Sequence, residues 1–217
     1  DLANCLMSFG LHALWNKKLV HNTVNTLQKE PCVTILDLCA GTGDIAFRFP
    51  QYKTLKIQAL HLLDFSHEMI AIAKKRGAKN QEPIFYHEGD AQQLPFKNNT
   101  FSAITMAYGI RNIQNPKKCL MECRRVLKIG GTLAILELTR PKNSILQHLH
   151  TLFLRTYIPL IGKLITKDKA AYNYLKSSVL QFLSPEELIK IAEDIGFTKI
   201  KIEPLSGGIA TLYLFTN

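Results

Sequence analysis

Short apolar runs alternate with polar and amphipathic stretches along most of this chain. These runs are nearly continuous, which is typical of strands buried on both faces of a parallel sheet. They span residues 33–38, 57–63, 84–87, 101–106 and 132–138. Because segments with helical periodicity separate them, we expect strand and helix to alternate as parallel βαβ units.

Local signals predict where the helices between those strands begin. One helix is expected from about Ile45, and Ser66 is a plausible N-cap for a second. Pro116 opens a third helix, which extends through Leu127 and carries apolar residues at helical spacing. The glycine pair at 130–131 is then expected to turn the chain into the fifth strand.

The C-terminal third departs from this pattern. Residues 143–183 are predicted to be a helical insertion that covers a substrate, because they mix apolar and basic side chains. Ser184, followed by proline and two acids, begins another helix. The runs 199–204 and 211–215 are separated by a short connection, which favours an antiparallel pair. Residues 1–217 therefore predict a single α/β domain with helices on both faces of a seven-stranded, mostly parallel sheet whose last strand is antiparallel.

Composition narrows the class of protein without naming a ligand. The chain has 27 basic and 17 acidic residues and a formal net charge of +10, which attracts nucleic acid, acidic lipid or a phosphate-bearing ligand. Its five cysteines form no Cys-x-x-Cys pair and complete no metal site, which favours reduced thiols. The apolar segment 145–165 is interrupted by charges and proline, so we predict no transmembrane helix and a cytoplasmic location.

A glycine loop follows the first predicted strand. In open α/β sheets, ligands bind beyond the carboxyl ends of the strands. Gly41, Thr42 and Gly43 stand at this place, and bare glycine backbone lets a ligand approach closely. Asp37 and Asp44 bring negative charge to the loop, which would repel two phosphates and would suit a ligand that carries a sulfonium and an ammonium group.

Acidic residues also end the next two predicted strands. Asp64 ends the second strand, where a carboxylate can accept both hydroxyls of a ribose. Asp90, with Ala91, follows the third strand, where an acid can accept from an adenine amino group. Each Asp taken singly is also explained as a loop or cap residue. Acids at three consecutive strand ends, together with the glycine loop, favour a nucleoside-bearing ligand.

Several motifs resemble one family of enzymes. The segment Asp-Leu-Cys-Ala-Gly-Thr-Gly-Asp at 37–44 resembles class I methyltransferases that bind S-adenosylmethionine. Met-Ser-Phe-Gly-x-His-x-x-Trp near the N-terminus and Gly-x-Arg-Asn at 109–112 are more specific. Further matching segments lie at 94–96, 124–131, 171–175 and 206–210. Nearly end to end, the chain is similar to the ubiquinone/menaquinone biosynthesis C-methyltransferase family, which includes demethylmenaquinone methyltransferases.

This resemblance implies a Rossmann-like class I methyltransferase fold and a reaction. The reaction is methyl transfer from S-adenosyl-L-methionine to a ring carbon of a prenylated quinol, such as the conversion of demethylmenaquinol to menaquinol. Cofactor contacts are implied at Thr42, Asp64, Asp90, Ala91 and Ala107. Ala40 and Ser177 depart from the family's usual Gly and Glu, which leaves the cofactor site intact but puts the substrate contacts in doubt.

Two segments carry the candidate catalytic residues. Arg111 can stabilise a developing phenolate and Asn112 can orient a ring oxygen, although Arg111 is also explained as a surface or helix-dipole contact. His12 and Trp15 belong to residues 1–30. This segment either folds over the site as a helical lid, with His12 as a base or hydrogen-bond partner, or packs Trp15 into the core.

An apolar stripe runs along residues 145–165. Its first members are Ile145, Leu146, Leu149, Leu152 and Phe153, and it continues through Tyr157, Ile158, Ile161 and Ile165. The stripe either covers the core or forms an entrance for a prenyl tail. In the second case, basic residues face anionic lipid: Arg155, Lys163, Lys167 and Lys169. We therefore expect peripheral contact with the inner face of the membrane besides the prenylated quinol.

Other readings remain at this point. A nucleic-acid methyltransferase would explain the charge, but the Asn/Asp-Pro-Pro-Tyr signature is absent after the fourth strand, and no RNA-binding domain fits in this length. We therefore expect no nucleic-acid partner. Another small-molecule or RNA methyltransferase of the same fold, or a binding protein without catalysis, remains an alternative. The choice between naphthoquinol and benzoquinol acceptors and the oligomeric state, including a homodimer, stay open.

Overall fold

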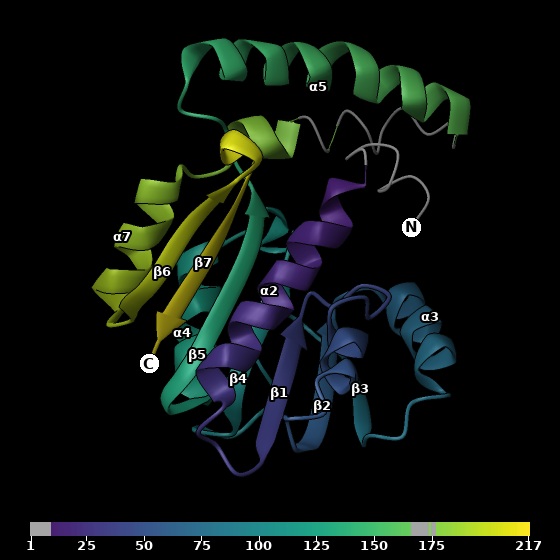
Figure 1. The fold of residues 1–217 in the computed structure, drawn as a ribbon, viewed down its shortest axis with the longest axis vertical. Coiled ribbons are helices and arrows are strands. Elements are labelled where there is room, and N and C mark those ends of the chain that lie inside the picture. The colour runs from purple at the N-terminus through teal and green to yellow at the C-terminus, as the bar shows by residue number, and fades with distance from the viewer. Residues whose placement is uncertain (1–9, 166–173, 175–176) are drawn as a thin grey trace.

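The computed structural model describes residues 10–165, 174 and 177–217, and of residues 154 and 157–165 it describes the backbone alone. Seven strands form a single sheet in this part of the chain (Figure 1). They are β1 (Val33–Leu38), β2 (Ile57–Asp64), β3 (Ile84–Glu88), β4 (Phe101–Ala107), β5 (Leu127–Leu138), β6 (Thr198–Leu205) and β7 (Ala210–Thr216). The strand order is β3-β2-β1-β4-β5-β7-β6.

Strand direction confirms the predicted sheet. β1 to β5 pair in parallel, whereas β7 pairs antiparallel with both β5 and β6. The order of the strands reverses between β1 and β4, which is where open α/β sheets bind their ligands. The carboxyl ends of β1, β2, β3 and β4 therefore define the edge at which a functional site is expected.

Helices cover both faces of the sheet, as predicted. The helices of the described part of the chain are α2 (Leu11–Leu27), α3 (His67–Gly77), α4 (Pro116–Val126), α5 (Ser144–Ile165) and α7 (Pro185–Ile195), with the 3-10 helices η1 (Ala46–Gln51), η2 (Ile110–Asn112) and η3 (Ser206–Gly208). Of these, α5 lies over the end of the sheet and not on a face. Two predicted caps are confirmed. The Ser66 side chain accepts from the backbone of Met69, and Ser184 forms a reciprocal capping box with Glu187.

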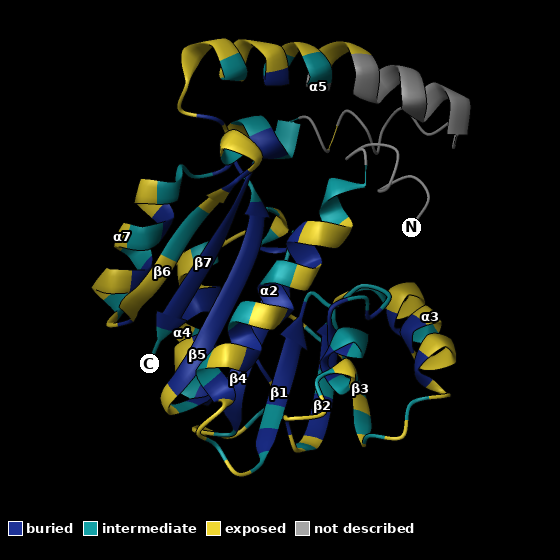
Figure 2. Ribbon diagram, viewed as in Figure 1, coloured by how far each residue is buried: buried dark blue, intermediate teal, exposed yellow. Residues whose placement is uncertain are grey.

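The sheet separates two apolar cores, one on each of its faces. Because side chains alternate along a strand, Ile35 of β1 packs on the core beneath α2, whereas Leu36 packs on the core beneath α4 and α7. Asp37 follows the same alternation and lies on the α2 side. Figure 2 shows the buried central strands, whereas the edge strands β6 and β3 are largely intermediate or exposed.

Three local expectations are corrected by the structure. The helix after the glycine loop is the 3-10 helix η1, which contains Pro50. Residues 89–100 form turns, so strand and helix do not alternate between β3 and β4. The glycine pair 130–131 lies inside β5, where pairing passes from Phe101 with Leu127 to Ala103 with Thr132. This shift in register is a bulge, and Gly130 takes the left-handed conformation there, with φ 77°.

Helix α2 is part of the core rather than a detached cover. Leu19 and Val20 are fully buried, and Trp15 is buried with its indole Nε1 donating to Ser206 Oγ at 3.1 Å. Of the two alternatives for the N-terminal segment, packing into the core therefore describes residues 11–27. Residues 1–9 of the predicted lid lie outside the described residues.

Helix α5 crosses the end of the sheet at which the parallel strands finish (Figure 1). Of the two alternatives for its apolar stripe, core packing does not describe the whole stripe, because Ile145, Leu149 and Leu152 are exposed. Lys167, Lys169 and residues 171–173 of the predicted cover lie outside the described residues, as do the side chains of the second half of the stripe. Among the described residues, no helix combines the length and apolar character needed to span a membrane.

Removing a buried side chain from α2 should destabilise the whole domain. Leu19 is fully buried against the sheet, so Leu19→Ala should lower the free energy of unfolding by about 2–5 kcal/mol in urea titrations. Leu14 on the same helix is 64% exposed, and Leu14→Ala should change it by less than about 0.5 kcal/mol. Similar small losses for both variants would instead indicate a loosely docked lid.

Candidate active site at the carboxyl ends of the strands

The glycine loop after β1 has a backbone that side chains rarely tolerate. Gly41 and Gly43 have positive φ angles of 53° and 84°. A Cβ at Gly43 would lie 2.5 Å from Phe47 Cε2, whereas a Cβ at Gly41 would meet nothing within 4 Å. Gly43 is therefore needed for packing, while Gly41 leaves an open approach to the loop.

Asp64 fixes this loop from the neighbouring strand. Its Oδ2 accepts from the backbone N–H of Gly41 at 2.8 Å, and its Oδ1 accepts from Ser66 N at 2.9 Å. The structure thus brings Asp64 and the glycine loop together, as predicted. Each carboxylate oxygen has a second lone pair, so Asp64 keeps acceptor capacity for a hydroxyl.

Asp37 holds the loop from beneath. This buried carboxylate accepts from Ala46 N at 3.1 Å and from Thr105 Oγ1 at 2.8 Å. Burial raises its pKa to about 7, while these hydrogen bonds oppose the shift. Asp37 is therefore a positioning group behind the predicted cofactor-binding loop, and its charge responds to pH near neutrality.

The other predicted cofactor residues occupy the same edge. Asp90 is exposed after β3, and its Oδ1 accepts from Gln92 N at 2.8 Å. Ala91 beside it is buried, and Ala107 is half-buried at the end of β4. Thr42 Oγ1 accepts from Arg76 Nη1 of α3 at 2.5 Å. Arg76 was not predicted as part of this site, because the sequence gives no sign that its helix reaches the loop.

Asp44 is paired with protein side chains, whereas the sequence prediction left its negative charge to a ligand. It pairs with Arg48 at 3.1 Å and accepts from Asn16 Nδ2 at 2.8 Å. Asn16 is buried on α2, and its Oδ1 accepts from Tyr108 OH at 3.0 Å. This network ties α2 to both the glycine loop and the end of β4. His12 is half-buried on the same helix, where burial lowers its pKa and Asp44 opposes that shift.

The turn after β4 packs directly against the glycine loop. A Cβ at Gly109 would lie 2.5 Å from Cys39 Cβ, so only glycine permits this approach. Arg111 follows in η2, and its Nη1 donates to Glu137 Oε1 at 2.5 Å and to Tyr108 O at 2.7 Å. The predicted catalytic arginine therefore lies beside the loop, and the simple surface-contact alternative is wrong because its side chain is largely buried.

Glu137 is the main residue that the sequence prediction missed. It is fully buried at the end of β5, where its Oε2 also accepts from Arg111 N at 3.2 Å. Burial raises the pKa of Glu137, while the Arg111 guanidinium opposes the shift. A single acid inside the apolar run 132–138 was the available signal, because a buried carboxylate requires a partner.

Asn112 points toward the predicted substrate cover. Its Oδ1 accepts from Tyr174 OH at 3.1 Å, and its Nδ2 lies 3.4 Å from Tyr108 O. Tyr174 belongs to one of the motifs in the sequence, so the structure joins two motifs that lie 62 residues apart. This contact places Tyr174 of the predicted cover next to the turn that holds Arg111.

Comparison with known proteins agrees with this arrangement. The model of the ubiE/COQ5 methyltransferase family matches residues 1–216. The chain belongs to this family. Membership identifies it as a methyltransferase, with S-adenosylmethionine as the methyl donor.

Individual relatives cover nearly the whole chain. A demethylmenaquinone methyltransferase of Protochlamydia amoebophila is 45% identical, over 98% of this chain and 87% of the relative. A ubiquinone/menaquinone biosynthesis C-methyltransferase of Agrobacterium fabrum is 36% identical, over 98% and 82%. The solved structure of an S-adenosylmethionine-dependent methyltransferase from Mesorhizobium loti covers 91% of this chain and 96% of its own, with TM-score 0.64 and 14% identity, which supports the fold alone.

The buried Asp37 should make stability depend on pH. Its pKa is raised from 3.8 to about 7, so the folded protein retains a proton that the unfolded chain has released. Stability from this residue is therefore present at about pH 4 and declines as the pH rises to about 7. Asp37→Asn mimics the protonated side chain and should remove the decline, by an amount on the order of 1–4 kcal/mol.

The measurement is the free energy of unfolding of both proteins between pH 4 and 8, in urea. Differences between the two curves matter, because other titrating groups contribute equally to both. Parallel curves would show that Asp37 titrates normally in the folded state.

Proposed function

We propose that the chain catalyses the S-adenosylmethionine-dependent C-methylation of a prenylated quinol ring, with demethylmenaquinol as the acceptor and menaquinol as the product. The names of the 45% and 36% identical relatives support this class of acceptor. We place a naphthoquinol ahead of a benzoquinol because the more similar of these two relatives is named for the former. The observation that carries the proposal is the buried Arg111–Glu137 pair beside the glycine loop.

The residues at the strand ends fit S-adenosylmethionine. Gly41 leaves its Cβ position open, so the amino-acid part of the donor can lie against the loop backbone. Asp64 retains lone pairs for the ribose hydroxyls, and exposed Asp90 beside buried Ala91 can accept from the adenine amino group. The donor supplies a methyl group that is already activated by its sulfonium.

Arg111 acts on the acceptor in this proposal. A quinol hydroxyl that gives its proton to solvent pushes electron density onto the neighbouring ring carbon, which would take the methyl group as the S–CH3 bond breaks and S-adenosylhomocysteine leaves. The methylated carbon then loses its own proton to solvent, which restores the aromatic ring. The Arg111 guanidinium stabilises the negative charge on that oxygen, and Asn112 orients a ring oxygen. Glu137 fixes Arg111 by accepting from its Nη1 and from its backbone N–H, whereas none of the described residues accepts from the buried Arg111 Nε. Holding the ring carbon about 3 Å from the methyl group then supplies much of the rate.

The reaction is tested with the purified chain, S-adenosylmethionine and demethylmenaquinol. We expect a quinol that is heavier by one methylene group, formed together with S-adenosylhomocysteine, and measured by mass spectrometry. Asp64→Ala should abolish detectable binding of the donor in calorimetry, because it removes the ribose acceptor and frees the loop. Donor binding without methylation of any quinol would refute the acceptor while retaining the cofactor site.

Replacement of Arg111 should separate catalysis from donor binding. Arg111→Lys keeps a positive charge near Glu137 but loses the planar guanidinium and the fixed directions of its N–H donors. Turnover should therefore fall about 10²–10³-fold. Affinity for the donor should stay within about twofold, since the hydrogen bonds of the Arg111 guanidinium go to Glu137 and Tyr108 O. Steady-state kinetics and calorimetry measure the two effects.

A paired variant controls for folding. Arg111→Ala leaves Glu137 buried without its partner, which costs about 3–5 kcal/mol and can unfold the protein. Changing both residues to leucine removes the two charges together, so this variant should recover stability and remain inactive. Full turnover in the folded double variant would show that Arg111 is structural.

A further inference from the structure

Three large apolar side chains form an exposed ridge on α5. Ile145 is 72% exposed, and Leu149 and Leu152 are each 58% exposed. Their spacing of four and three residues places them on the same side of the helix. We refer to these residues as the outer ridge. A single exposed leucine is ordinary, whereas a ridge of this kind marks a surface that contacts something apolar.

The opposite side of α5 is fixed to the domain. Leu146 packs against Gly207 of η3, and His150 is buried. The side chain of Asn143 accepts from the backbone of Ile145 at 3.0 Å and of Leu146 at 3.1 Å, which orients the first turn. The outer ridge therefore cannot turn inward unless these contacts break.

Cationic and polar groups flank the outer ridge. Arg155 lies three residues beyond Leu152 and is exposed on the adjoining side of the helix, which it shares with exposed His148. The chain as a whole carries a formal net charge of +10. An apolar ridge with an exposed arginine beside it resembles the helices that lie in a lipid interface.

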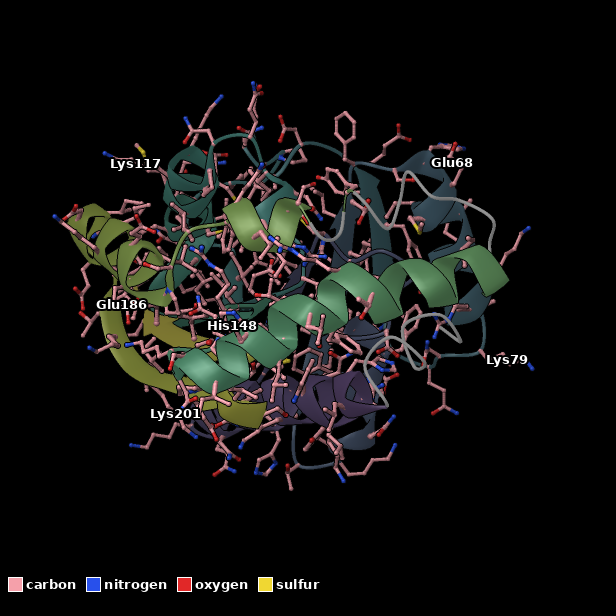
Figure 3. The ribbon with its side chains drawn as sticks, turned by 90° about the horizontal axis from the view of Figure 1, so that it is seen from above. Glu68, Lys79, Lys117, His148, Glu186 and Lys201 are labelled. Carbon is pink, nitrogen blue, oxygen red and sulfur yellow. The ribbon has the colours of Figure 1, made fainter. Side chains whose placement is uncertain are left out.

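The position of α5 relates the outer ridge to the candidate active site. The helix crosses the carboxyl ends of the strands, and its exposed side faces away from the sheet (Figures 1 and 2). Seen from above, α5 spans the molecule over the site edge, with His148 near its beginning (Figure 3). Whatever binds the outer ridge is therefore brought to the end of the domain that holds Asp64 and Arg111.

We propose that the outer ridge docks on a lipid bilayer, with Ile145, Leu149 and Leu152 among the acyl chains and Arg155 at anionic headgroups. The proposal rests on the proposed function, since a prenylated quinol resides in the bilayer and must reach the carboxyl edge from it. A second copy of the chain is a poorer occupant, because it would bring the same +10 charge to the contact. Docking through α5 presents the site edge to the membrane surface.

Vesicle flotation of the full chain tests the docking surface. One set of vesicles is phosphatidylcholine alone, and the other also contains phosphatidylglycerol. The double variant Leu149→Glu, Leu152→Glu should bind both sets at least about tenfold more weakly, because buried apolar area is lost. Arg155→Gln should weaken binding about fivefold on the anionic vesicles only.

Ile129→Glu is the matched control. Ile129 is 90% exposed in the first part of β5, at the edge of the sheet opposite the site. This variant carries the same type of change on another surface and should bind vesicles as the unaltered protein does. Thermal midpoints of all variants should be unchanged, since every replaced side chain is exposed.

Two results would overturn the proposal. One is unchanged vesicle binding by the double variant. The other is a change in oligomeric state, seen by analytical ultracentrifugation, without a change in vesicle binding, which would assign the outer ridge to a second copy. With a short-tailed quinol in solution, the double variant should turn over normally, whereas turnover should fall with a long-tailed quinol in vesicles. Failure of every quinol to react would refute the proposed function, while the flotation result would still decide the docking surface.

Discussion

The site depends on how two carboxylates hold one irregular loop. The backbone has positive φ angles at Cys39, Gly41 and Gly43, and it makes one turn hydrogen bond of its own, from Gly43 N to Ala40 O at 2.9 Å. The N–H groups of Gly41 and Ala46 are instead taken up by side chains from outside the loop. Asp37 holds the far end of the loop from beneath, and Asp64 holds Gly41 from the neighbouring strand. Asp37 lies near the end of β1 and Asp64 at the end of β2, and the parallel pairing of these two strands sets the two acids side by side. The sheet therefore positions the loop, and the loop then presents open backbone to a donor.

Much of this arrangement was predictable from sequence because it follows from local pattern and from topology. Continuous apolar runs predicted the buried strands, and Ser66 and Ser184 predicted helix starts that the structure confirms. Topology then implied that Asp37, Asp64 and Asp90 lie at one edge, since the carboxyl ends of parallel strands meet there. The N-terminal segment was harder. Trp15 and Leu19 are buried against the sheet, but a histidine and a tryptophan three residues apart fit a core helix and a lid equally well.

Other parts of the site depend on contacts that a linear pattern does not encode. Asn16 and Asp44 are joined across 28 residues, and Arg111 and Glu137 across 26. The sequence prediction assigned the charge of Asp44 to a ligand. It could not show that Arg48 and Asn16 bind this carboxylate, because each of these side chains could reach several other residues. The bulge at Gly130 was also missed, because paired glycines indicate a turn and an irregular strand equally well.

The Arg111–Glu137 pair shows why such hidden contacts matter for chemistry. Two opposite charges buried together gain little net stability, because removing both from water costs about as much as their attraction returns. A pair of apolar side chains would fill the same space at less cost, so stability alone does not explain it. What the pair does provide is a guanidinium held in one orientation by Glu137 and by Tyr108 O, in the turn whose Gly109 packs on Cys39 before the glycine loop. A fixed positive group needs no reorganisation when negative charge develops on an acceptor, and this is the property that catalysis requires.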